Sequence, residues 1–207
     1  PTLEYIDPVR YITNKSSGKQ GYAIAKSLKD NGFETTLISG PTNLDQIPGI
    51  ETIRVNSAKE MLDATLKNLP ADVAIFSAAV ADYKVNKIET EKIKKQDNLN
   101  LTLEKNVDIL GHISKHNSLR PKLVIGFAAE TSELEKNSQK KLLEKNCDWI
   151  IANDISNTNI GFNSEYSFDL DANNFFSIAP DDNSFSRISC FLTISLTLSN
   201  GIIKFYF

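Results

Sequence analysis

Short apolar runs alternate along the chain with stretches whose apolar positions recur every three to four residues. Five runs have the length of a buried strand, and they cover residues 33–39, 51–55, 72–77, 122–127 and 148–152. Strands that are apolar throughout are typical of a sheet covered on both faces. The alternation with helical patterns therefore predicts an α/β domain of three layers with a mainly parallel sheet.

Two helix starts carry the pattern of a capping box, in which a hydroxyl and a carboxylate each accept a hydrogen bond from an N–H group of the helix start. The first is Ser57 with Glu60, which predicts a helix to about Asn68. The second is Ser132 with Glu135, which predicts a helix to about Asn146. Residues 108–116 also have a helical pattern, and residues 99–103 alternate weakly.

The two ends of the chain fit this scheme poorly. Pro1 is followed directly by a loop, so the first strand that should precede this loop is missing. After about Ser164 the composition changes to Asn, Ser, Asp and Phe, and the tail from Ile188 alternates like a strand. We expect one domain over residues 1–207 with an atypical segment at 165–207, and a long lysine-rich loop at 84–95.

Composition excludes several classes of protein. Apolar residues make up 41% and charged residues 24% of the 207 residues, which is ordinary for a globular domain. The net charge of −3 argues against wholesale nucleic-acid binding. Cys147 and Cys190 have no zinc or disulfide spacing. We expect a cytoplasmic protein, because the chain shows no signal peptide and its apolar tail is too interrupted to span a membrane.

The opening loop, residues 7–21, contains the strongest chemical signal. Two glycines, two serines and Lys19 lead straight into a helical pattern, and the N–H groups of a helix start bind anions. The loop is not a Walker A motif, because Thr13 and Gln20 stand where Gly and Ser or Thr are required. A serine-capped helix with glycines for tight packing is the alternative.

Three further groups have both a functional and a structural interpretation. The basic cluster at 92–95 is either a solvated loop or a lysine flap that closes on phosphates. Lys141 and Lys145 share one helix face, either in solvent or as a second anion clamp. Asp82 follows a stretch of small residues after Ser77. It either accepts a hydrogen bond from a ribose hydroxyl, binds a metal or forms a structural turn.

His112 and His116 have the spacing of a metal pair, but no third ligand is evident, so the metal ligands stay unassigned. Nothing in the sequence resembles a catalytic triad or a pair of catalytic carboxylates. Any chemistry is therefore expected to be electrostatic and positional.

Five segments in order, DPVRYITNKSSGKQG, AAVADY, EKIKKQ, GFAAET and IANDIS, closely resemble bacterial phosphopantothenoylcysteine synthetase. In that family this domain is often the C-terminal half of a bifunctional protein of coenzyme A biosynthesis. The resemblance covers residues 1–164 and implies a Rossmann-like or ribokinase-like fold. It also implies a homodimer, in which the lysine flap and nearby strands contribute to a shared site, and a possible association with a flavin-dependent decarboxylase.

The resemblance implies a ligase reaction in two steps. The carboxylate of 4′-phosphopantothenate attacks the α-phosphate of CTP and releases pyrophosphate, with Mg²⁺ accompanying the triphosphate. The amine of L-cysteine then attacks the acyl-cytidylate, which gives 4′-phosphopantothenoylcysteine and CMP.

The same resemblance assigns roles to individual residues. Asn14 would hold the carbonyl of the acyl phosphate, Arg10 would bind the pantothenate half, and Lys92 would neutralise charge as the cytidylate forms. The residues expected to bind CTP, besides Lys92, are Ser17, Gly18, Lys19, Phe76, Ser77, Ala78, Asp82, Glu104, Lys105, Asn106, Val107, Phe127, Lys141 and Lys145.

Two other functions stay open. The missing first strand and the unusual tail suggest a catalytically silent nucleotide-binding subunit or scaffold. A nicotinamide-dependent oxidoreductase is less well supported, because no GxGxxG motif with a downstream acidic residue is present.

Overall fold

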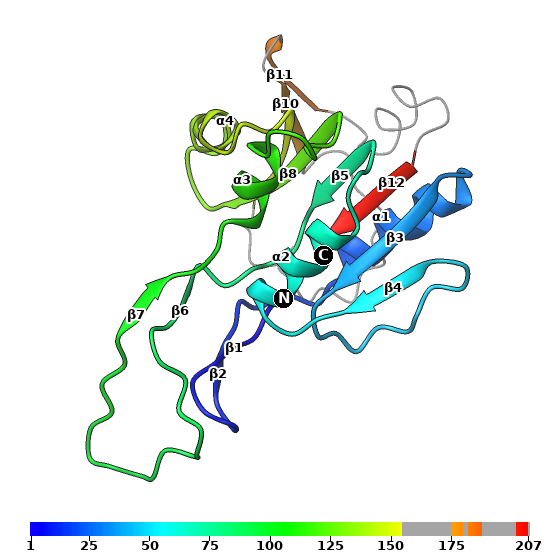
Figure 1. The fold of residues 1–207 in the computed structure, drawn as a ribbon. Helices are drawn as coiled ribbons and strands as arrows, with labels where there is room; N and C mark the ends of the chain where they lie inside the picture. The colour runs from blue at the N-terminus through cyan, green and yellow to red at the C-terminus, as the bar shows by residue number, and fades with distance from the viewer. Residues whose placement is uncertain (155–174, 180–181, 188–201, 207) are drawn as a thin grey trace.

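The computed structural model describes residues 1–154, 175–179, 182–187 and 202–206 of the 207-residue chain. An eight-stranded sheet lies at its centre, and two small two-stranded sheets lie beside it (Figure 1). The strands of the large sheet are β3 (Glu34–Ser39), β4 (Glu51–Arg54), β5 (Val73–Phe76), β8 (Leu123–Glu130), β9 (Trp149–Asp154), β10 (Phe175–Ala179), β11 (Asp182–Arg187) and β12 (Ile202–Tyr206).

The large sheet has the order β11-β10-β9-β8-β5-β12-β3-β4. In this order, all neighbouring strands from β9 through to the edge strand β4 pair in parallel. At the other edge, β10 pairs antiparallel with β9, and β11 pairs antiparallel with β10. The predicted mainly parallel sheet is therefore confirmed. The carboxyl ends of its parallel strands meet at one edge, where ligands bind in sheets of this kind.

The C-terminal strand β12 lies inside the sheet, between β3 and β5. Its register pairs Tyr206 with Ile38 on one side and with Phe76 on the other, so it runs parallel to both neighbours. β12 therefore occupies an interior position of the sheet, which the sequence analysis did not predict. No described strand of the large sheet precedes β3 in the chain, in agreement with the expected absence of a first strand. The residues between 188 and 201 lie outside the described part, so the rest of the predicted tail strand is not tested.

The N-terminus starts beside the carboxyl end of β3. A Cβ added at Gly40 would lie 1.8 Å from the carbonyl oxygen of Pro1, so only glycine allows this close approach. Pro1 and the end of β12 thus lie at the same edge of the sheet, and the two ends of the chain are marked close together in Figure 1.

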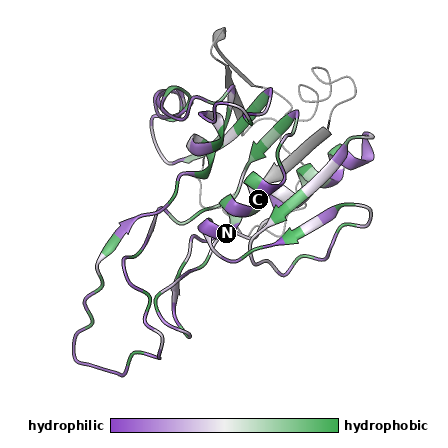
Figure 2. Cartoon of the chain, in the orientation of Figure 1, coloured by the Kyte–Doolittle hydropathy of each residue, from purple (hydrophilic) through white to green (hydrophobic). Residues whose placement is uncertain are grey.

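Helices cover both faces of the sheet. One face carries α2 (Ala58–Lys67), α3 (Ile109–Ser114) and α4 (Leu134–Lys145), and the other carries α1 (Lys19–Asp30). Neighbouring residues of β5 alternate between the two sides: Ile75 packs with α1, and Ala74 packs with the other three helices. Figure 2 shows apolar residues concentrated on the central strands, as a sheet covered on both faces requires.

The two predicted capping boxes have different outcomes. The Ser57 side chain accepts a hydrogen bond from the Glu60 N–H, and the Glu60 carboxylate accepts one from the Asn56 N–H, so the start of α2 is confirmed. The predicted capping box at Ser132 is wrong, because the N-cap of α4 is Glu133, which has a left-handed conformation (φ 46°) and makes no side-chain cap hydrogen bond. The end of α4 at Lys145 agrees with the prediction.

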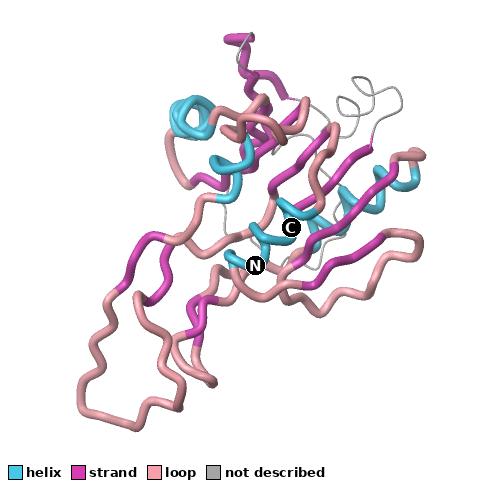
Figure 3. Tube along the Cα trace, in the orientation of Figure 1, coloured by secondary structure: helices cyan, strands magenta, loops and turns pink. Residues whose placement is uncertain are grey.

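The two small sheets form a projecting part of the molecule. The first pairs β1 (Glu4–Tyr5) with β2 (Tyr11–Ile12), and the second pairs β6 (Tyr83–Val85) with β7 (Leu103–Lys105). We call β6, β7 and the intervening residues 86–102 the arm. Figure 3 shows it extending from the body mostly as loop, which confirms the predicted lysine-rich loop beyond Val85. No helix in the described residues is long and apolar enough to span a membrane.

Candidate functional site

A cavity of about 530 Å³ lies at the carboxyl ends of β3, β5, β8 and β9. We call it the edge pocket. It is lined by the loop before α1, by the loop after β5 and by the ends of β8 and β9. Of the predicted site residues it brings together Asn14, Ser17, Gly18, Lys19, Phe76, Ser77, Ala78, Asp82, Phe127 and Lys141.

The start of α1 presents its N–H groups to this pocket. Gly18 is the N-cap in a left-handed conformation (φ 77°), and no side chain caps the helix. The serine-capped start considered as the alternative is therefore not formed, and the nearest contact, from the Lys19 N–H to Ser17 Oγ, is long at 3.4 Å. An uncapped first turn beside Lys19 is a suitable place for an anion.

The loop after β5 is fixed from several sides by hydrogen bonds. Asn14 Nδ2 donates to the Val80 carbonyl at 2.8 Å, and Asn106 Nδ2 donates to the Ala81 carbonyl at 3.0 Å. The Ala81 N–H donates to Thr2 Oγ1 at 3.1 Å. Asn14 therefore connects the loop before α1 to the opposite wall of the pocket, and Asn106 connects that wall to the residues that directly follow the arm.

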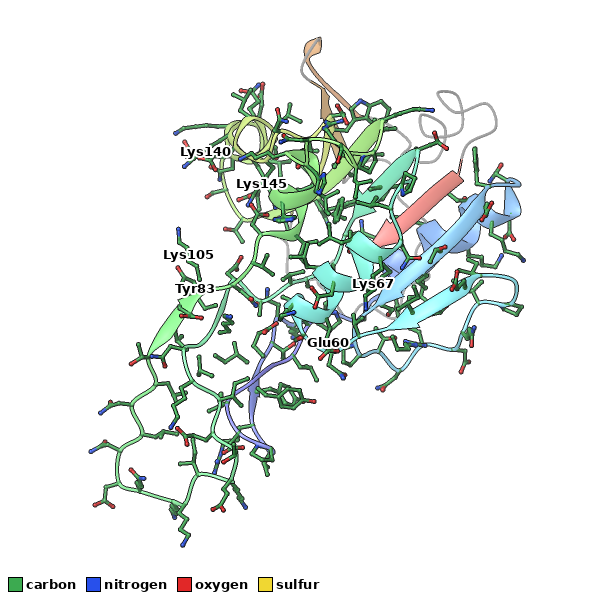
Figure 4. All side chains as sticks on the ribbon, in the orientation of Figure 1. Glu60, Lys67, Tyr83, Lys105, Lys140 and Lys145 are labelled. Carbon is green, nitrogen blue, oxygen red and sulfur yellow. The ribbon has the colours of Figure 1, made fainter. Side chains whose placement is uncertain are left out.

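A second cavity of about 590 Å³ lies next to the edge pocket. The two share Phe76, Ala78, Asp82, Phe127 and Lys141, together with Val80, so they are two compartments on either side of these residues. The second compartment adds the predicted site residues Lys105, Asn106, Val107 and Lys145. Figure 4 shows Tyr83 and Lys105 at the base of the arm and Lys145 on α4.

The two predicted site lysines of α4, Lys141 and Lys145, differ in their surroundings. Lys141 is largely enclosed and donates to the Phe127 carbonyl at 2.7 Å. Burial, followed by the charge of Lys145, lowers the pKa of Lys141, and the carboxylates of Glu130 and Asp82 partly oppose this shift. Lys145 forms an ion pair with Asp108 (Nζ–Oδ2 2.7 Å). A bound anion near Lys141 would stabilise its charged form.

Three predicted residues lie outside both compartments. Lys92 lines a third cavity in the arm, and Glu104 pairs with Lys84 across the arm at 3.3 Å. The Arg10 guanidinium pairs with the carboxylate of Asp7 and donates to the Ile93 carbonyl at 3.3 Å. These contacts place Arg10 at the junction between the β1–β2 hairpin and the arm.

Asp7 is a positioning residue that the sequence analysis missed. Its side chain is fully buried, and its carboxylate accepts hydrogen bonds from the N–H groups of Val9, Arg10 and Ile93. Burial alone would raise the pKa of Asp7, but these bonds and the Arg10 guanidinium outweigh it and lower the pKa to about 2. An Asp three residues before an Arg in a turn was the available signal.

Gln20 and Asn153 were also missed. Both line the edge pocket, and Gln20 Nε2 and Asn153 Oδ1 are buried without a hydrogen-bond partner in the part of the chain that the structure describes. Asn153 lies near the carboxyl end of β9, directly after the apolar run predicted at 148–152. Because ligands bind beyond the carboxyl ends of the strands in parallel sheets, its place after this run was the available signal.

The histidine pair and the described cysteine do not form a metal or nucleophile site. His116 Nδ1 accepts from the Leu119 N–H at 3.1 Å, so this ring is engaged locally. No group of three or more potential metal-binding His, Cys, Asp or Glu residues occurs among the described residues. Burial raises the pKa of Cys147 to about 11, which keeps this thiol protonated and poorly reactive.

Residues 1–173 match the family model of the DNA/pantothenate metabolism flavoprotein C-terminal domain. The chain belongs to this family. It is 45% identical over 168 residues to the coenzyme A biosynthesis bifunctional protein CoaBC of Vibrio parahaemolyticus serotype O3:K6 (strain RIMD 2210633), covering 79% of this chain and 42% of the relative. It is 44% identical over 168 residues to CoaBC of Bacillus subtilis (strain 168), covering 80% and 41%. The chain thus spans less than half the length of these relatives.

Solved structures agree with this membership. The crystal structure of the C-terminal domain of a CoaBC protein superimposes with a TM-score of 0.70 and 35% identity, covering 95% of this chain and 87% of that one. A Cab2 mutant in complex with phosphopantothenate-cysteine gives a TM-score of 0.67 at 15% identity, covering 91% and 78%, which supports the fold alone. The family accordingly confirms the resemblance identified from the five sequence segments.

Proposed function

We propose that this chain joins L-cysteine to 4′-phosphopantothenate in coenzyme A biosynthesis, with CTP as the activating nucleotide and an acyl-cytidylate as the intermediate. The observation that carries the proposal is the edge pocket, where family membership and geometry agree. Residues from four of the five resembling segments line this one cavity: Ser17, Asp82, Phe127 and Asn153 are examples. The bifunctional relatives have names that place them in the same pathway.

The two compartments suit the two parts of a nucleoside triphosphate. The uncapped first turn of α1 and Lys19 offer donors for phosphate oxygens on one side. The second compartment offers the Asn106 and Asp82 side chains and Lys145 for the nucleoside. Lys141 lines both cavities, so its ammonium group would contact the triphosphate where it passes from one compartment to the other.

Asn14 is suited to stabilise the charge that develops on the acyl group. One hydrogen of its NH₂ group is used in the bond to Val80, and the second remains available to a carbonyl oxygen in the pocket. Because the Val80 bond fixes the amide, this donor needs little reorganisation during the reaction. We therefore assign Asn14 to the acyl side of the reaction.

Mg²⁺ would be held mainly by the triphosphate. Asp82 is the one acidic side chain among the described residues that line the edge pocket, and it is exposed to both compartments. One carboxylate together with substrate phosphates and water is a usual set of ligands for Mg²⁺. The ion would neutralise phosphate charge, and Asp82 would orient it from the β5 side.

A second copy of the chain would complete the site. Lys92 and Arg10 lie on the projecting part, outside both compartments, so an arm from a partner is a direct way to bring Lys92 to the phosphates. The projecting part also exposes large apolar side chains that a partner would cover. They are Tyr5, Val9, Tyr11, Tyr83, Ile88, Leu99, Leu101 and Leu103.

From the family resemblance we further propose that the chain acts in the cytoplasm with a flavin-dependent decarboxylase, as a fused domain or a separate chain. The relatives are named bifunctional proteins of coenzyme A biosynthesis, which is consistent with a second activity beside the ligase. The decarboxylase would work after the ligase, because it acts on the ligase product. A pull-down of decarboxylase activity by the tagged chain would test this association.

The main test measures pyrophosphate release from CTP and Mg²⁺, with and without phosphopantothenate, and follows the products by mass after L-cysteine is added. We expect release only with phosphopantothenate, and the cysteine adduct only with all substrates. ATP in place of CTP tests the nucleotide preference. Folded protein that CTP stabilises against heat but that releases no pyrophosphate would contradict the proposal and favour a silent nucleotide-binding subunit.

A further inference from the structure

Asn153 carries an acceptor that the described protein leaves unused. Its Oδ1 is buried and makes no hydrogen bond within the described residues, although the side chain lines the edge pocket. A buried amide oxygen without a partner is unfavourable, because it has lost its bonds to water and gained none. A ligand that donates a hydrogen bond at this point would remove that penalty.

The surroundings of Asn153 leave room for a small ligand group. The register of β8 and β9 sets Asn153 directly opposite Ala129, and Ala128 and Ala129 both line the pocket. Methyl side chains beside the amide neither fill the space nor compete for its hydrogen bonds. A small group that binds in the pocket beside Ala128 and Ala129 can therefore approach the amide, where it would donate to an oxygen that is shielded from water.

The polarity of the pocket indicates what kind of group binds there. The side chains at the α1 end, Ser17 and Lys19, supply donors for anions, and the unpartnered atom of Gln20 is the Nε2 donor. Asn153 differs, because its unpartnered atom is an acceptor and lies near the end of β9 rather than at the start of α1. Phosphate and acyl-phosphate oxygens cannot donate to it, but an amino group can.

We propose that Asn153 forms the binding subsite for the amino group of L-cysteine, with Oδ1 accepting an N–H of the amine. This inference rests on the proposed function and specifies where the second substrate binds. A neutral acceptor suits this task, because it orients the amine through one N–H while leaving the lone pair free. A carboxylate at the same place would hold the amine in its protonated, non-nucleophilic form.

The test separates the two half-reactions in the Asn153→Leu variant, which keeps a similar volume and removes the acceptor. We expect the KM for L-cysteine to rise about tenfold or more. The KM values for CTP and phosphopantothenate, and the cysteine-independent release of pyrophosphate in a single turnover, should change less than about twofold. An unchanged cysteine KM, or an equal loss in the first half-reaction, would overturn the subsite.

The matched control is Thr52→Val on β4, outside the edge pocket, which removes another buried oxygen that has no hydrogen-bond partner among the described residues. Its kinetics should equal those of the wild type. If wild-type protein released no pyrophosphate at all, the proposed function would fail, and the subsite with it. If the wild type completed both steps and Asn153→Leu behaved like Thr52→Val, the subsite alone would fail.

A second variant keeps the test valid if leucine prevents folding. Asn153→Asp keeps an acceptor and adds charge, so we expect a lower KM for L-cysteine together with a lower kcat, because the amine stays protonated. A purely structural role for Asn153 would not produce this split between KM and kcat. An Asp variant whose cysteine KM rises while its kcat is unchanged would overturn the inference.

Discussion

The edge pocket and the projecting arm are built in opposite ways. The pocket lies where buried strands end: Ile75 and Ile125 of its strands are fully inaccessible, and Phe76 is 9% exposed. The arm contains two three-residue strands and a long connection, and it exposes Ile88 (59%) and Leu99 (48%). The pocket is therefore built by residues of the core, whereas the arm presents an apolar surface of the kind that marks an interaction site. Most of the predicted site residues line the two compartments beside the core, whereas Arg10, Lys92 and Glu104 lie on the projecting part.

The largest effect should come from removing the Lys92 side chain on the arm. Lys92→Ala should reduce the rate of pyrophosphate release about 10²–10³-fold, because the charge that develops on phosphate loses its counter-charge. Stopped-flow detection of pyrophosphate measures this rate. Lys87→Ala, on the same arm with an exposed ion pair to Glu89, serves as the control and should change it little.

Mixing two inactive variants sharpens this prediction. In hybrids of Lys92→Ala with Asn14→Ala, one of the two sites combines an intact Asn14 with an intact Lys92 only if the arm reaches across to the partner. An equal mixture should then recover about a quarter of the wild-type activity, since about half of the dimers are hybrids. No recovery in mixtures with verified subunit exchange would show that the arm acts on its own chain.

The free energy of unfolding should also differ between variants of the core beside the pocket and variants of the arm. Ile125→Ala should lower the free energy of unfolding by about 2–4 kcal/mol, because the residue is fully buried beneath α1. Leu101→Ala, exposed by 41% on the arm, should change the unfolding of isolated subunits by less than about 0.5 kcal/mol. Denaturant unfolding at low protein concentration measures both. Similar losses would contradict the separation of pocket and arm.

Self-association of the chain should depend on the arm rather than on the core. Leu101→Asp should weaken self-association about tenfold or more, because a charge would be buried in an apolar interface. Leu143→Asp is the control, since Leu143 is 76% exposed but lies on α4. Sedimentation velocity over a concentration series measures the change. If the control dissociated and the arm variant did not, the interface would lie elsewhere.

The smallest expected effect is a change in thermal stability with pH, and it concerns Asp7, which links the β1–β2 hairpin to the arm. Its pKa is lowered in the folded chain, so its contribution to stability is complete above the ordinary carboxyl pKa near 4 and is lost as the pH falls towards 2. Asp7→Asn should therefore have a lower Tm than the wild type at pH 6. That difference should shrink towards pH 2 in paired thermal scans, and a constant difference would contradict the lowered pKa.

The sequence predicted the parts of the fold that depend on local pattern. The apolar runs placed β5, β8 and β9 within a few residues because strands buried on both faces leave a continuous apolar signal. The start of α4 was wrong because Glu133 takes a left-handed turn that a spacing rule cannot detect. The location of β12 was not predictable either, since a strand pattern does not specify its neighbours.

The sequence also predicted many of the residues that the structure brings together at the candidate site. Four of the five segments contain residues that converge on the edge pocket, because strand ends in a parallel sheet meet at one edge. Asp7 and Asn153 were missed because their importance lies in partners, or the lack of partners, that only the folded chain reveals. The separation of Lys92 from the pocket was likewise invisible, because it depends on where the arm points.

The position of β12 also has a mechanical consequence. β3 and β5 share no hydrogen bonds with each other, and the five residues of β12 form the only ladder between them in the described chain. The strand order places the loop before α1 and the loop after β5 on opposite sides of this join. A force that peeled β12 from the sheet would separate the loop before α1 from the loop after β5, so the proposed ligand site lies along the join that β12 forms in the large sheet.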